Sequence, residues 1–172
     1  RLVAWGGDGG TVPADLDVVT SISATLFAVA AVTEQGTVVA WGNSRYGGSM
    51  TDVTVEGVLY TGVPAGLRGV LAIYSSQHAF AALRDDGTVH AWGNSRYGGV
   101  GVPATLRNVK SIFSTGGSFA ALTNEGTVAA WGFAYTGGSM SNGKKYAGVP
   151  RDLARVKTCL LYTSPSPRDQ LQ

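Results

Sequence analysis

Short apolar segments alternate with polar, glycine-containing turns along this chain, and the alternation repeats. Two copies are especially clear, FAALRDDGTVHAW at 80–92 and FAALTNEGTVAAW at 119–131, and each has an apolar run on both sides of the turn. Gly36, Gly87 and Gly126 take the same place in successive turns, with Thr and Val after each one. Two apolar runs around such a turn predict a β-hairpin in which the glycine has a positive φ.

A further apolar segment precedes each hairpin. Leu, Val and Ile follow one another there at intervals of three, as at Leu106, Val109 and Ile112. This spacing alone is compatible with a helix, but the adjacent hairpin favours a strand. We therefore predict three strands per unit, which in the third unit cover 109–114, 118–123 and 127–131.

The middle strand of each unit is apolar on both faces, as in the stretches 80–83 and 119–122. A strand buried on both faces needs a sheet packed against each side, and the alanines in these stretches indicate that the sheets approach closely. Small sheets stacked in this way predict a β-propeller, with a β-solenoid as the alternative.

Two landmarks divide the chain into units, an Ala-Trp-Gly triplet and a Val-Pro pair. Their positions are Trp5, Trp41, Trp92 and Trp131, and Pro13, Pro64, Pro103 and Pro150. The first three of these Pro residues are each followed by a Trp 28 positions later, whereas the intervals from Trp to the next Pro are 8, 23, 11 and 19 positions. A constant segment joined by variable ones indicates a rigid unit joined by surface loops. The stretch AWGNSRYGG is identical at 40–48 and 91–99.

The order Val-Pro-x-x-Leu, Val-x-x-Ile and then FAALTNEGTVAAWG resembles the repeat of the regulator of chromosome condensation family. It is most similar to the compact bacterial form shared with a β-lactamase inhibitor protein. The resemblance covers residues 1–158 and implies a seven-bladed propeller whose blades are four-stranded antiparallel sheets. The complete units are 13–41, 64–92 and 103–131, and a truncated fourth begins at 150. We therefore expect an all-β fold, a partial and open β-propeller.

The family's histidine in the second strand is kept at His78, while Phe27 and Gly117 replace it in the other units. After residue 158 the repeat stops and the chain ends in CLLYTSPSPRDQLQ. Two Ser-Pro pairs do not suit a central strand, and the segment resembles translated sequencing-adapter read-through. We expect residues 159–172 to be non-native or disordered, and the chain to be a fragment.

Composition narrows the function classes. A net charge of +2 does not favour nucleic acid or an anionic membrane, and no cofactor is implied. One cysteine and two histidines provide neither a disulfide nor a zinc site of the usual spacing. The uncharged, largely apolar run 18–33 is short for a membrane-spanning helix. The sequence also has no catalytic motif, and the adjacent carboxylates Asp85 and Asp86 fall in a turn. We expect a protein that is not an enzyme.

The candidate binding residues lie in the variable Trp-to-Pro loops, which project from one end of each blade. Arg and Tyr dominate interface hot spots, and such residues in these loops are Arg45, Tyr46, Arg96, Tyr97 and Tyr135. Lys144 and Lys145 belong to the most basic segment and could meet an acidic partner or phosphate. The alternative is that the tyrosines pack over the neighbouring blade, and that the arginines and lysines are only solvated.

We interpret the chain as a protein-interaction scaffold that binds a protein partner through these loops. The alternatives are a guanine-nucleotide exchange factor for a Ran-type GTPase, or the regulatory propeller of a larger enzyme such as a ubiquitin ligase. An open set of blades leaves sheet edges unpaired, so we expect self-association. The sequence favours a cytoplasmic or nuclear location.

Overall fold

The structure is a computed structural model that describes residue 13 and residues 16–138. The predictions for Lys144 and Lys145, for the fourth unit from 150 and for the tail 159–172 concern residues outside the described part of the chain.

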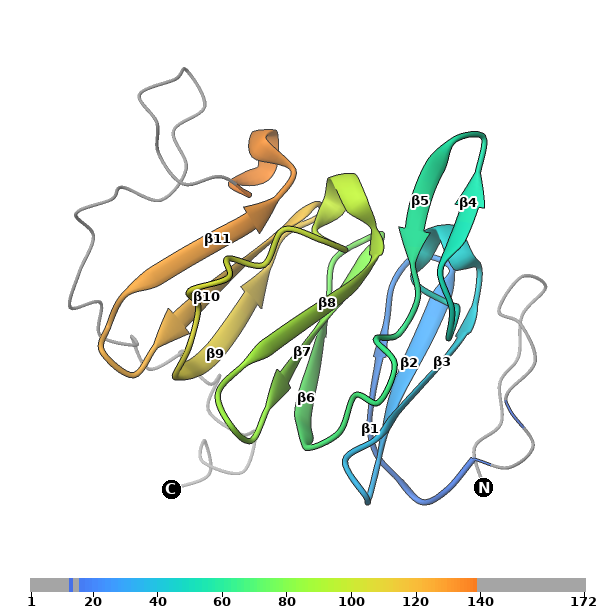
Figure 1. The fold of residues 1–172 in the computed structure, drawn as a ribbon, viewed down its shortest axis with the longest axis horizontal. Coiled ribbons are helices and arrows are strands. Elements are labelled where there is room, and N and C mark those ends of the chain that lie inside the picture. Colours follow the sequence, from blue (N-terminus) through green and yellow to red (C-terminus); the bar gives the residue numbers. More distant parts are fainter. Residues whose placement is uncertain (1–12, 14–15, 139–172) are drawn as a thin grey trace, which may run out of the picture.

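Three antiparallel sheets follow one another along the chain, each built from consecutive strands (Figure 1). Their strands are β1 (Val19–Ala24), β2 (Ala28–Thr33), β3 (Val38–Gly42), β6 (Val70–Ser75), β7 (Ala79–Arg84), β8 (Val89–Asn94), β9 (Val109–Ser114), β10 (Ser118–Thr123) and β11 (Val128–Gly132). In the third sheet the first two strands have the expected bounds, and the last begins and ends one residue later than expected. The all-β fold of an open array of blades is confirmed.

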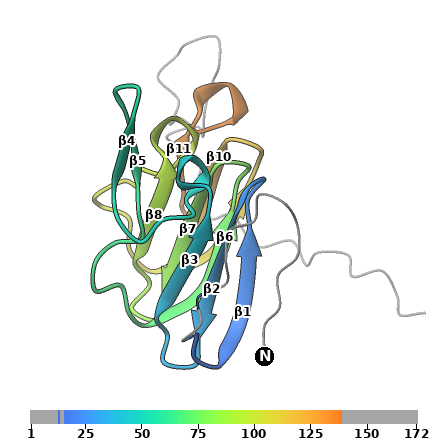
Figure 2. The same cartoon turned by 90° about the vertical axis from the view of Figure 1, so that its right-hand side faces the viewer.

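The long segment between Trp41 and Pro64 forms an additional hairpin, β4 (Val53–Val55) and β5 (Val58–Thr61). β5 pairs with β8 of the following blade, so the middle sheet has the order β4-β5-β8-β7-β6. The described blades therefore have three, five and three strands, and not the uniform four that the family resemblance implies. The hairpin projects beyond the end of the blades (Figures 1 and 2).

The sheets pack face to face, and β7 shows why its sequence is apolar throughout. Phe80 and Ala82 belong to a core cluster shared with the first blade, whereas Ala79, Ala81 and Leu83 belong to a cluster shared with the third. The prediction of a strand buried on both faces is confirmed, because the alanines of β7 and Phe80 are fully buried. The small side chains leave the neighbouring sheets room to approach.

The turn glycines connect each blade to the next. Gly36, Gly87 and Gly126 have φ values of 69°, 72° and 79°, as predicted. The carbonyl of Gly36 accepts a hydrogen bond from the N–H of Val70 at 3.0 Å, and that of Gly87 accepts one from Val109 at 3.0 Å. A side chain at Gly87 would come within 3.0 Å of the next blade's backbone. Both the turn and the contact between blades therefore favour glycine.

The tryptophans join the blades at the opposite end. The indole N–H of Trp92 donates to the carbonyl of Gly47 in the preceding blade at 3.1 Å, and that of Trp131 donates to Gly98 at 3.2 Å. Gly47 itself has a φ of 90°, and a Cβ there would lie 2.8 Å from the ring of Phe80. The repeated Trp and Gly-Gly positions thus share one structural role, which is to tie a loop to the core of the next blade.

Replacing Trp92 by Phe should keep most of the buried aromatic volume but leave the carbonyl of buried Gly47 without its donor. An unsatisfied buried group costs about 1–3 kcal/mol, so we expect the free energy of unfolding in urea to fall by about that amount. Trp41→Phe is the matched control, because the Nε1 atom of Trp41 has no acceptor among the described residues. Equal losses in the two variants would contradict the role given to the hydrogen bond.

Candidate partner-binding surface

A short 3-10 helix follows the last strand of each repeat unit. These helices are η1 (Ser44–Tyr46), η2 (Ser95–Tyr97) and η3 (Ala134–Thr136), and they lie at the same end of the array (Figure 1). The side chains of Asn43 and Asn94 cap the first two by accepting hydrogen bonds from the N–H groups of Arg45 and Arg96, at 2.9 and 3.0 Å. Each helix ends at a glycine in the left-handed conformation. This local chemistry explains why AWGNSRYGG occurs twice with the same shape.

Aromatic rings at this end form a continuous row across the three blades, which we call the aromatic row. It consists of Phe27, Tyr46, His78, Tyr97, Phe133 and Tyr135, and neighbouring ring centroids are 4.2–5.4 Å apart. Such spacing is typical of interacting aromatic side chains. The row therefore crosses both boundaries between blades.

His78 lies in the middle of this row. Its ring stacks on Tyr46 of the first blade at 4.9 Å and on Tyr97 of its own blade at 4.2 Å. Its Nδ1 atom is buried and has no hydrogen-bond partner among the described residues. Burial lowers the pKa of His78 below its ordinary value, so the imidazole is neutral at pH 7.

In the third blade the aromatic side chain of the row comes from a different position in the repeat unit. Gly117 stands where the earlier blades have Phe27 and His78, and Phe133 stands where they have a capping asparagine. A Cβ at Gly117 would come within 2.9 Å of Tyr97 and 3.3 Å of Phe133. Phe133 packs against Tyr97 at 5.4 Å and continues the row, while the capping hydrogen bond is lost.

Hydrogen bonds hold the backbone below the row. The hydroxyl groups of Thr25, Ser76 and Ser118 donate to the carbonyls of Tyr46, Tyr97 and Thr136, at 3.1, 3.3 and 2.6 Å. Backbone bonds from Leu26 to Gln77 and from Gln77 to Gly116, both 3.1 Å long, connect the turns of successive blades. The rings are therefore carried on a fixed surface and not on independent loops.

The structure brings the predicted residues of the described region to this one end. Tyr46 and Tyr97 are half-buried within the row, and Tyr135 is exposed at its end. Arg45 and Arg96 are exposed beside it. Arg45 lies 3.9 Å from Glu56 of the hairpin, and both side chains are largely solvated, which makes this a weak ion pair.

Sequence reasoning missed Phe27, His78 and Phe133 as members of the surface. An alignment of the three units contains a signal for this surface, because the unit that has Gly117 in place of an aromatic residue has Phe133 in place of asparagine. The two positions are distant in the sequence, so their compensation is visible only when the units are compared side by side.

Other polar groups of the described region offer little chemistry. Hydrogen bonds from the side chain and backbone of Thr88 lower the pKa of Asp86, which lies in an exposed hairpin turn. Within residues 16–138 no group of three His, Cys, Asp or Glu side chains is placed to hold a metal ion. That part of the chain also has no helix with the length and hydrophobicity needed to cross a bilayer.

Comparison with known proteins agrees with this architecture. Residues 19–47 match the family described as Regulator of chromosome condensation (RCC1) repeat. No curated protein matches the chain in sequence.

Solved structures match most of the chain. Human WBSCR16 superposes with a TM-score of 0.53 at 22% identity, over 72% of this chain and 35% of that one. Yeast RCC1 (Prp20), solved bound to Kap60, gives 0.54 at 22% identity over 78% and 35%. A second structure of Prp20p from Saccharomyces cerevisiae gives 0.51 at 19% over 74% and 34%. The chain thus spans about a third of the length of these proteins, and the resemblance to RCC1-type repeats is confirmed.

The position of His78 predicts a pH dependence. A histidine whose pKa is lowered by folding binds fewer protons in the native state than in the unfolded state, so the free energy of unfolding falls as the pH drops below about 6.5. His78→Phe, which introduces the residue of the first blade, should make this fall smaller. Urea unfolding at about pH 7.5 and about pH 5.5 measures the difference.

His90→Val is the companion variant, which measures the contribution of the second histidine. The pKa of His90 is also lowered by burial, and the first blade has Val39 at the same position. Each single variant should remove part of the pH dependence and the double variant most of it. An unchanged fall in His78→Phe would contradict the assignment.

Proposed function

We propose that this chain is a protein-interaction scaffold whose partner binds at the end that carries the 3-10 helices. The observation that carries the proposal is the aromatic row, which presents rings from three blades on one surface with Arg45 and Arg96 exposed beside it. A few residues dominate the binding energy of a protein interface, and tyrosine and arginine are among the residue types enriched there.

The arginines are the part of the repeated loop that the fold leaves unexplained. Within AWGNSRYGG the tryptophan, asparagine, tyrosine and glycines each make a contact that shapes the loop or the next blade. Arg96 is exposed and makes no ion pair with any described residue. A guanidinium in this position is free to bind a carboxylate of a partner in a bidentate way.

The β4–β5 hairpin enlarges the same surface. It projects from this end of the array (Figure 2), and Leu59 on it is 45% exposed. Arg45 approaches Glu56 of the hairpin at 3.9 Å, and the next residue in the chain is Tyr46 of the aromatic row. A partner seated on the row would therefore meet an apolar side chain and a basic one together. We propose that Lys144 and Lys145 add positive charge to the partner site.

The proteins with similar structures support a binding role. The yeast RCC1 (Prp20) structure contains Kap60, and Prp20p is described by its binding properties to Gsp1p and histones. These partners belong to those proteins, and at 19–22% identity the likeness supports a shared fold. A propeller of this type that presents one end to a protein is consistent with the surface described above.

The double variant Arg45→Ala/Arg96→Ala tests the proposal. Partners are first identified by cross-linking the full-length protein and are then titrated as purified proteins. We expect the double variant to weaken binding at least tenfold, which corresponds to about 1.4 kcal/mol and is within the range of a hot-spot pair.

Arg68→Ala/Arg107→Ala is the matched control. Both residues are exposed arginines, and each lies next to the first strand of its blade, at the end away from the 3-10 helices. This variant removes the same charge and should leave the affinity unchanged. Equal losses in both variants would indicate a general charge effect and would overturn the assigned surface.

Guanine-nucleotide exchange on a Ran-type GTPase is the alternative activity, and a regulatory propeller of a larger enzyme is another. Exchange would require a loop wedged at the nucleotide site, and no described residue carries such a role over. We therefore expect the full-length protein to leave the rate of nucleotide release from the GTPase unchanged. Acceleration, abolished in the double variant Arg45→Ala/Arg96→Ala, would replace the scaffold proposal by exchange activity.

A further inference from the structure

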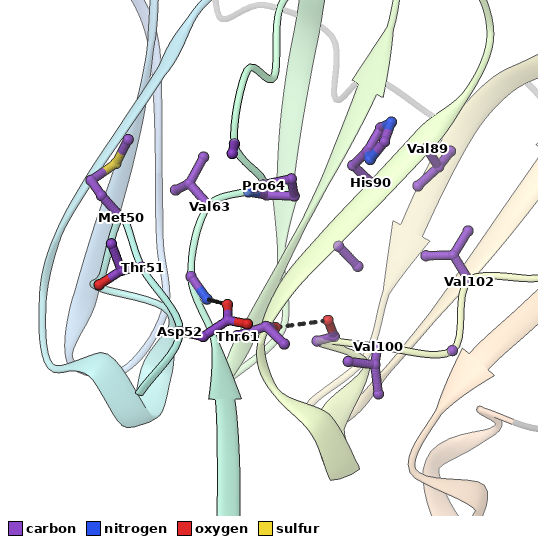
Figure 3. Close-up of a pocket in the computed structure, with 15 residues that line it drawn as sticks. Met50, Thr51, Asp52, Thr61, Val63, Pro64, Val89, His90, Val100 and Val102 are labelled. Atoms are coloured by element: carbon purple, nitrogen blue, oxygen red, sulfur yellow. Dashed lines mark hydrogen bonds between the residues drawn. The ribbon is translucent and has the colours of Figure 1, made fainter. Parts of the chain in front are cut away.

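A groove of about 650 Å³ lies along the outer edge of β8, away from the aromatic row. Figure 3 shows Val63 and Pro64 on one side of it and Val100 and Val102 on the other. Val89, His90 and Ala91 of β8 lie between these two walls. The groove is therefore mostly apolar and has a β-strand at its base.

Along the groove, the edge of β8 has backbone groups that make no hydrogen bond to any of the described residues. Asn94 donates its N–H to His78 and Thr88 accepts from Arg84, so the even-numbered residues of this segment bond to β7. Successive residues of a strand alternate in direction, which turns the peptide groups of Val89 and Ala91 outward. At the position equivalent to Ala91 in the first blade, Ala40 directs its N–H outward to Met50 Sδ, at 3.4 Å.

β5 already pairs with this edge, but only at the C-terminal end of β8. The pairing consists of Tyr60 with Asn94 and Thr61 with Gly93. Thr61 ends it, because its hydroxyl accepts from the N–H of Gly93 at 3.1 Å and donates to the carbonyl of Gly99 at 3.1 Å. The groove begins at this point and continues the same edge toward Val89. The chain thus shows how a strand docks on β8, and leaves the next part of the edge open.

The polar groups of the groove add specificity. His90 stands where the other two units have Val39 and Ala129, so the repeat does not require an imidazole there. Burial and the nearby charge of Arg84 lower the pKa of His90, which is therefore a neutral hydrogen-bonding group at pH 7. Asp52 lines the groove beside Thr61, and its Oδ1 atom accepts from the N–H of Gly62 at 3.0 Å. A carboxylate has further acceptor sites.

We infer that the groove binds an extended segment of a partner protein, which adds a strand to the N-terminal part of β8, next to the part that β5 occupies. Its backbone pairs with Val89 and Ala91, its β-branched apolar side chains pack against the valines of the two walls, and a Lys or Arg at one end meets Asp52. Main-chain pairing of this kind gives affinity, and the pockets on either side select the side chains. About four residues are enough to follow this edge, at about 3.3 Å per residue. The inference is independent of the surface proposed above.

The test uses the whole ¹⁵N-labelled chain and a capped peptide, Lys-Val-Thr-Val-Thr-Val, as the probe. We expect saturable shifts of the Val89 and Ala91 amide signals with a Kd of about 1 mM or below. Hydrogen exchange at these two amides should slow at least tenfold. The same peptide with Glu in place of Lys should bind more weakly, and Asp52→Asn should remove the difference between the two peptides.

Ala91→Pro is the decisive variant, because it removes an outward N–H while the bonds to β7 are kept, and proline is tolerated on such an edge. It should abolish peptide binding. Ala130→Pro, the same register position in β11, should leave binding unchanged; far-ultraviolet circular dichroism checks that both fold. If Ala91→Pro does not fold, the inference is tested by whether Asp52→Asn removes the difference in affinity between the Lys and Glu peptides.

Three outcomes would overturn the inference. They are no saturable shift at Val89 and Ala91, equal binding to Ala91→Pro and the wild-type chain, and shifts confined to the aromatic row. Arg45→Ala/Arg96→Ala should leave peptide binding unchanged, so failure of this inference and failure of the proposed scaffold surface are separate results.

Discussion

The hydrogen bond from a buried indole to a glycine carbonyl of the preceding blade is the interaction on which the arrangement of this surface depends. It fixes a loop of one blade against the core of the next at 3.1–3.2 Å, and it recurs at Trp92 and Trp131. The glycine that accepts it must have no side chain, since a Cβ would meet the neighbouring phenylalanine. The strands of each blade can form locally, but the register between blades is set by this contact and by the turn glycines at the other end.

The loop held by the indole is also the loop that carries the 3-10 helix. Because Gly47 is fixed, Tyr46 next to it is placed over the boundary between two blades, where it meets His78. The hydrogen bond that packs one blade against the next therefore also positions the aromatic row. The groove at β8 has a different origin, because it arises where the inserted hairpin stops covering a strand edge.

The sequence predicted the elements that depend on local chemistry. The strands, the glycine turns and the double-sided burial of β7 follow from apolar runs and glycines in fixed positions, and the structure has them. It did not predict β5 on β8, because that pairing joins residues of different units through an insertion that occurs once among the described loops. The row was predicted only through Tyr46, Tyr97 and Tyr135. The positions of Phe27, His78 and Phe133 depend on ring contacts across blades, which no local pattern encodes.

In the third blade the aromatic side chain comes from Phe133 and not from position 117, and this affects which single substitutions the blade can accept. A side chain at Gly117 would require Tyr97 to shift, because a Cβ there would lie 2.9 Å from the ring of Tyr97, and the loss of Phe133 would interrupt the stack. The first two blades have the opposite combination, an aromatic side chain at the first position (Phe27, His78) and a capping asparagine at the second. The third blade thus completes the aromatic row with a different pair of residues, so the two positions have to be exchanged together if the loop of one blade is to replace that of another.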